Sequence, residues 1–165
     1  MSLAMTVTQY RKARGLSQEL LAIRVKHHRS TLAKVESGER PCPPGLEAEL
    51  VRENWRFALK IADERTGGWI SNMLEHCPEM DLHPAALKEL MMKELHDLKT
   101  ALEGLVLAKH IDPDQNRERA RELWHEATDV IEVAAILRGV MEEHFNLDMP
   151  QLVKEHEMQR REMKR

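Results

Sequence analysis

Two pairs of acidic residues, each with a spacing of three, lie in the second half of this 165-residue chain. Glu94 and Asp97 form the first pair, and Glu126 and Asp129 form the second after 28 intervening residues. Residues three apart on a helix share a face, so each pair can direct two carboxylates towards a neighbouring helix. Carboxylate oxygens suit Mg²⁺, a hard cation that prefers oxygen ligands. The spacing therefore indicates a possible magnesium site, provided that both segments are helical.

The same carboxylates also fit an ordinary solvated helix face. Charged residues with a spacing of three are common in charged helices, and Glu122 continues the second pair opposite the apolar Leu123 and Ala127. The segment His125-Glu126-x-x-Asp129 differs from the H-E-x-x-H pattern of zinc hydrolases. A helical module without a metal therefore stays open as the alternative.

Positive charge is concentrated at the front of the chain. Residues 1–60 contain eleven Lys or Arg and six Glu, a net charge of +5, whereas the remainder contains 14 basic and 22 acidic residues, a net charge of −8. The total of −3 hides this asymmetry. A basic front and an acidic back indicate that only the front meets a polyanion.

Composition predicts an all-α protein. Apolar residues make up 42% of the chain and aromatic residues only 4%, and most Gly and Pro lie outside the stretches of helical periodicity. The break at Thr66-Gly67-Gly68 divides the chain into expected domains at 1–66 and 67–165. Because there is no apolar run of about 18 residues and no disulfide framework, we expect a cytoplasmic protein without a membrane span.

Three short helices are predicted ahead of residue 40. Thr6-Val7-Thr8-Gln9 has the spacing of a capping box, and Gly15 ends the first helix. Ser17 caps the second helix, and the third runs over residues 29–37 and ends at Gly38. The residues expected to form a core between the second and third helices are Leu20, Val25, Leu32 and Val35.

Longer helices are predicted after the prolines that follow residue 40. Their expected ranges are 46–62, 69–76, 115–145 and 151–165, together with a long helix from Pro84 that ends at Ile111-Asp112-Pro113-Asp114. The segment Val130–Leu137 is apolar on nearly all sides of its helix. Such a segment is buried among several partners or in a dimer interface.

The segment from Gly15 to Gly38 resembles the helix-turn-helix of the Xre/Cro family of regulators, and the match extends over about residues 6–62. It consists of G-L-S-Q-E-L-L-A, four further residues and H-H-R-S-T-L-A-K-V-E-S-G. The resemblance implies a lambda-repressor-like domain that binds double-stranded DNA with its third helix in the major groove. The residues assigned to DNA binding are Gln18, Lys26, His28, Arg29, Ser30, Thr31, Lys34 and Arg40.

These residues have different expected roles. Arg29, Ser30 and Lys34 face base edges, and Arg29 suits a guanine through two parallel hydrogen bonds. The residues expected near the DNA backbone are Gln18, Thr31 and Arg40. The alternative is a helical hairpin with a solvated basic face and no specific ligand.

Two positions depart from the family pattern. Lys26 stands where many members have Gly, and a left-handed Lys there would cost about 1 kcal/mol or more in strain. His28 replaces the usual Ser or Thr cap, which weakens the start of the third helix. The resemblance also implies an ion pair between Arg11 and Glu36 that ties the first helix to the third.

The back of the chain, residues 85–165, is similar to the all-α nucleotide pyrophosphohydrolases of MazG type in its paired acidic motifs. The similarity implies that Glu94, Asp97, Glu126 and Asp129 hold Mg²⁺, which would bind phosphates and help a water molecule to attack. Asp97 stands where the family prefers Glu, and a flanking basic motif for a triphosphate is not evident.

Three interpretations of this half therefore stay open: a dimerisation module, an active hydrolase, and a related scaffold that senses a nucleotide without turnover. We favour a helical bundle that dimerises, with no catalytic residues and no cofactor; Mg²⁺ belongs only to the alternatives. The expected function is a regulator that binds a DNA operator as a homodimer.

Overall fold

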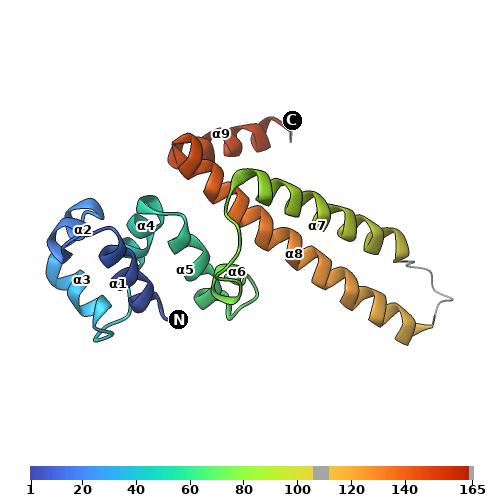
Figure 1. Ribbon diagram of the computed structural model, residues 1–165, viewed down its shortest axis with the longest axis horizontal. Coiled ribbons are helices and arrows are strands. Elements are labelled where there is room, and N and C mark those ends of the chain that lie inside the picture. Colours follow the sequence, from blue (N-terminus) through green and yellow to red (C-terminus); the bar gives the residue numbers. More distant parts are fainter. Residues whose placement is uncertain (106–111, 164–165) are drawn as a thin grey trace. The chain divides into compact units, whose positions relative to one another are not determined.

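The computed structural model describes residues 1–105 and 112–163, and within these ranges every regular element is a helix (Figure 1). The prediction of an all-α protein is therefore confirmed. The helices are α1 (Leu3–Ala13), α2 (Gln18–Arg24), α3 (Arg29–Glu36), α4 (Pro44–Glu53), α5 (Arg56–Thr66), α6 (Met73–His76), α7 (Pro84–Gly104), α8 (Pro113–Phe145) and α9 (Met149–Glu162). None of them is long and apolar enough to cross a membrane.

The chain forms two compact units. The first consists of Met1–Glu75 together with the chain from Asp148 onward, and the second consists of His76–Leu147.

The first unit has one apolar core, to which α1 to α5 all contribute. Its fully buried side chains are Val7, Leu21, Val25, Leu32, Leu46, Leu50 and Phe57. The prediction for the second helix was wrong by one residue, because Leu20 is 52% exposed while Leu21 is completely buried. Adjacent leucines point in directions about 100° apart on a helix, so only one of them can face the core.

Helix ends follow local chemistry, with one correction. The Ser17 hydroxyl accepts a hydrogen bond from the Leu20 amide at 3.1 Å and caps α2 as predicted. The first helix, however, begins at Leu3 with Ser2 as its cap, so Thr6 lies inside α1, and its hydroxyl donates to the Ser2 carbonyl. The capping box predicted at Thr6 was therefore wrong.

The predicted continuous helix over residues 46–62 is divided into α4 and α5. The break is at Asn54, whose backbone is extended, with φ −160° and ψ 132°. Its side-chain oxygen accepts a hydrogen bond from the Arg56 amide at 3.0 Å, which holds the start of α5. Trp55 is buried at the same corner, so apolar periodicity continues across a real break.

The second unit is a hairpin of two long antiparallel helices, α7 and α8, which lie side by side along most of their length (Figure 1). Its buried apolar side chains are Leu87, Val133, Ile136 and Val140. The helix α7 ends at Gly104, where Leu105 is extended, and the end predicted for it at Ile111 lies outside the described residues. In the helix that follows the hairpin, α9, no described residue is buried, and its predicted end at residue 165 also lies outside them.

Lys26, at a position where a Gly was expected, has a left-handed backbone with φ 53°. We expect Lys26→Gly to raise the free energy of unfolding by about 0.5–1 kcal/mol, because glycine relieves the strain at a smaller entropic cost. Lys26→Ala keeps the strained Cβ and serves as the control. Chemical denaturation measures both variants, and an equal effect of the two would contradict the strain.

Candidate nucleic-acid interface and acidic cluster

The turn between α2 and α3 is fixed by backbone hydrogen bonds. The Lys26 amide donates to the Ile23 carbonyl at 3.1 Å, and the His27 amide donates to the Ala22 carbonyl at 2.9 Å. Ala22 and Val25 are buried where the two helices meet. These contacts set α3 at a fixed angle to α2 and leave its other face towards solvent.

The exposed face of α3 presents polar side chains at the start of the helix. Arg29 and Ser30 are exposed, Thr31 is half-buried, and Lys34 follows one turn later. In the part of the chain that the structure describes, the Arg29 and Ser30 side chains make no hydrogen bond or ion pair. Lys34 lies 3.5 Å from Glu39, and both side chains are more than half exposed. Such exposed pairs contribute little and are readily exchanged for another partner.

The other predicted DNA contacts differ in their availability. His28 is exposed and makes no side-chain cap for α3, as expected from the loss of Ser or Thr. Lys26 extends into solvent with its ammonium group 3.5 Å from Glu49, and Arg40 is exposed after α3. Gln18, by contrast, is half-buried, and its side-chain amide donates a hydrogen bond to the Glu36 carboxylate at 2.8 Å.

Glu36 receives hydrogen bonds from two other helices. Arg11 donates to both of its oxygens, at 2.6 and 2.9 Å, and its third nitrogen donates to the Leu16 carbonyl at 3.0 Å. The expected pair between Arg11 and Glu36 is thus present, and Gln18 completes it. Burial would raise the pKa of Glu36, but the hydrogen bonds from Arg11 and Gln18 outweigh it and hold this pKa below its usual value.

These helices, their turn and the ion pair between them define a known domain. Residues 2–52 match the family model of the helix-turn-helix domain. This part of the chain is a helix-turn-helix domain. No curated protein and no solved structure matches the chain.

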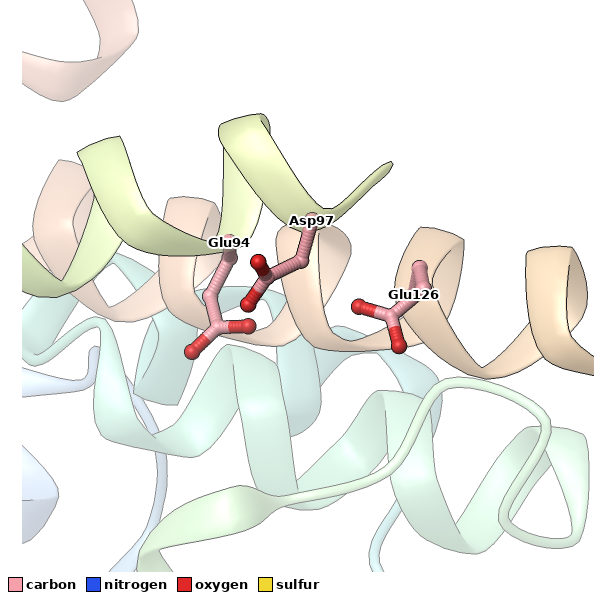
Figure 2. A group of neighbouring side chains, drawn as sticks. All are labelled: Glu94, Asp97 and Glu126. Atoms are coloured by element: carbon pink, nitrogen blue, oxygen red, sulfur yellow. The ribbon is translucent and has the colours of Figure 1, made fainter. Parts of the chain in front are cut away.

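Outside the helix-turn-helix domain, the hairpin brings three of the four predicted metal ligands together (Figure 2). One carboxylate oxygen from each of Glu94, Asp97 and Glu126 lies within 4.8 Å of the others. Asp129 is outside this group. Its pKa is raised by burial and by the nearby charge of Glu94.

Lys93 supplies a cation to this cluster, which the sequence analysis did not foresee. Its ammonium nitrogen lies 3.1 Å from Glu94 and 3.1 Å from Asp97. The hydrogen bond to Asp97, and to a lesser extent the one to Glu94, raises the pKa of Lys93. The oxygen donors suit Mg²⁺ chemically, but Lys93 already neutralises two of them. Because its side chain is 64% exposed, Lys93 can turn away to admit an ion.

A cleft of about 380 Å³ lies beside the acidic cluster between α7 and α8. The residues that line it are Asp97, Thr100, Ala101, Gly104, Arg119, Glu122 and Glu126. Arg119 is the cation in this lining and was also missed. The available signal was its spacing, since Arg119, Glu122 and Glu126 recur at i, i+3 and i+7 on one face of a helix.

The Glu36 network predicts a measurable effect on the helix-turn-helix domain. We expect Glu36→Gln to lower its free energy of unfolding by about 2 kcal/mol at neutral pH, because Arg11 loses its charged partner in a nearly buried position. A folded-state pKa below the unfolded value gives stability that is present above the unfolded pKa and lost as pH falls through the folded pKa.

Wild-type protein should therefore lose stability on acidification over this interval, and Glu36→Gln should lose less. Denaturant titrations at several pH values measure the difference. Glu39→Gln, at an exposed position on the neighbouring turn, is the control. Identical acid profiles for wild type and Glu36→Gln would rule out the role of this carboxylate.

Proposed function

We propose that the protein is a sequence-specific transcriptional regulator of Xre/Cro type that binds a DNA operator as a homodimer in the cytoplasm. The observation that carries this proposal is that Arg29, at the start of α3, is exposed and makes no side-chain hydrogen bond or ion pair with the described part of the chain. Arg is the side chain that most often reads guanine in the major groove. The first turn of the second helix of this motif is the part that reaches base edges.

The other predicted DNA-binding residues of the domain have different roles in this proposal. Ser30 and Lys34 share the exposed face with Arg29, whereas Gln18 is bonded to Glu36 and helps to hold the helices. We therefore assign Gln18 chiefly a positioning role, with Lys26, His28, Thr31 and Arg40 near the DNA backbone.

A homodimer fits the size of the reading element. With eight residues, α3 can present only a few side chains to base edges, so one copy reads a short site. Two copies related by a two-fold axis would read half-sites about 34 Å apart, one turn of DNA. This doubles the sequence that is read.

Arg29 and Lys26 should affect DNA binding differently. We expect Arg29→Ala to abolish the discrimination between an operator selected from random DNA and unrelated DNA, because the contact to a base is lost. Lys26→Ala should weaken binding to both DNAs alike and reduce the salt dependence by about one charge, because it removes a phosphate contact. Fluorescence anisotropy at several salt concentrations measures both effects.

Circular dichroism of each variant is the control for folding. Equal losses on operator and unrelated DNA for Arg29→Ala would remove Arg29 from base reading. No preference of the wild-type protein for any selected sequence would overturn the proposal of an operator.

A second candidate function rests on the acidic cluster. Glu94, Asp97 and Glu126 lie together beside a cleft that Arg119 also lines, an arrangement able to receive a Mg²⁺-bound phosphate. When bound, Mg²⁺ would polarise a phosphate and a water molecule. The candidate is a nucleoside triphosphate pyrophosphohydrolase or a nucleotide sensor that is fused to the helix-turn-helix domain.

This candidate predicts pyrophosphate release from a panel of nucleoside triphosphates in the presence of Mg²⁺, and Glu126→Gln should stop it. For a sensor, calorimetry should show Mg²⁺-dependent nucleotide binding without release.

Lys93→Ala should tighten Mg²⁺ binding about tenfold, since it removes a competing cation. Glu89→Gln, on the exposed surface of α7, is the control. If wild-type protein shows neither pyrophosphate release nor nucleotide binding, this candidate is rejected.

A further inference from the structure

Five exposed residues of α8 repeat at intervals of seven: Arg117, Trp124, Ile131, Arg138 and Phe145. The three apolar side chains are 50–56% exposed, and the two arginine side chains are 74% and 69% exposed. A spacing of seven places side chains along one line of a helix, with a slow drift that supercoiling removes. We call these five residues the heptad row.

A second row of smaller residues runs beside the heptad row. Ala120, Ala127 and Ala134 also recur at intervals of seven, each four residues before a member of the heptad row. Alanine leaves room for another helix to approach closely, and a large side chain one turn away can fill the space beside it. The two rows together have the pattern of a helix that packs against a partner helix.

We propose that the heptad row is the interface of the homodimer, in which α8 of one copy pairs antiparallel with α8 of a second copy about a two-fold axis at Ile131. This inference rests on the dimer in the proposed function and identifies its surface. An isologous interface of this kind brings each residue against a fixed counterpart on the other copy.

The chemistry of the row is symmetric about Ile131. In the antiparallel arrangement, Ile131 meets its own copy, Trp124 meets Arg138, and Arg117 meets Phe145. Each arginine thus faces an aromatic ring, a favourable contact that is stronger when it excludes water. The residue types of the row are therefore complementary to a second copy of the same row.

A parallel arrangement lacks this complementarity. It would place Arg117 against Arg117 and Arg138 against Arg138, so that like charges meet twice. The existing partners of these arginines do not prevent the antiparallel contact. Arg117 pairs with Asp114 at exposed positions, where ion pairs are worth little. The partner of Arg138, Glu142, is only 14% exposed, but the Arg138 side chain itself is 69% exposed and keeps a face open for a ring.

The size of the surface is also suitable. From Arg117 to Phe145 the row extends about 42 Å at 1.5 Å per residue. The half-exposed Trp124 and Phe145, with Ile131 and the two arginine stems, leave several hundred Å² open, the order of one side of a standard protein interface. Trp and Arg are also the residues that most often dominate binding energy at interfaces.

The test measures the mass of the full chain by sedimentation equilibrium. We expect wild-type protein to form dimers and Ile131→Glu to raise the dimer dissociation constant about 100-fold, because two carboxylates would meet on the axis. Ile23→Glu makes the same change at a 64% exposed position on α2 and should leave the mass unchanged. A monomeric wild type, or equal effects of the two variants, would overturn the proposal.

Cross-linking distinguishes the two arrangements and does not depend on a disruptive variant. In a Cys77→Ser background, Ile131→Cys should couple to its own copy with a short bismaleimide, whereas Arg117→Cys should not. Antiparallel pairing separates the two copies of position 117 by about 42 Å. Cys42 is buried with its pKa raised to about 12, so it should stay unreactive. Coupling through Arg117→Cys would contradict the antiparallel arrangement.

DNA binding separates failure of this interface from failure of the proposed function. Ile131→Glu should keep its discrimination for a single half-site and lose the tighter binding to two half-sites. Arg29→Ala should keep the dimer mass and lose discrimination. A normal dimer mass with no operator preference would leave the interface standing and reject the DNA proposal.

Discussion

The arrangement of helices in the helix-turn-helix domain depends most directly on the hydrogen bonds to the Glu36 carboxylate. It accepts hydrogen bonds from Arg11 of α1 and from Gln18 of α2, and it belongs to α3 itself. Apolar packing brings these helices together without direction, whereas hydrogen bonds to a charged group fix distances and angles. This nearly buried carboxylate and the hydrogen-bonded turn between α2 and α3 together fix the orientation of the exposed face of α3.

Much of the first unit could be predicted from sequence, because its signals are local. Ser17, Gly15 and Gly38 mark helix ends through backbone chemistry that neighbours barely change. The errors arose where two local signals compete. Leu20 and Leu21 are equally apolar, and the turn at Asn54 interrupts a helical pattern that continues on both sides of it. Only packing across the domain decides such cases.

The acidic cluster could likewise be predicted only where its residues lie on the same helix. Spacing alone placed Glu94 beside Asp97, since both lie on one helix. The register of α8 against α7 brings Glu126 to them and leaves Asp129 outside, and no local pattern fixes that register. Lys93 was missed because sequence gives no direction for a long flexible side chain.

The missing cap on α3 has a thermodynamic consequence. The His28 side chain supplies no acceptor, and its carbonyl accepts from the Thr31 amide at 3.0 Å, so it is the Arg29 and Ser30 amides whose hydrogen-bonding capacity is left for an outside oxygen. A DNA phosphate is such an acceptor and is favoured by the positive end of the helix dipole. Under the proposed function, a DNA phosphate would cap the start of α3. Because DNA would then bind the folded domain and not the unfolded chain, it would raise the melting temperature of the domain.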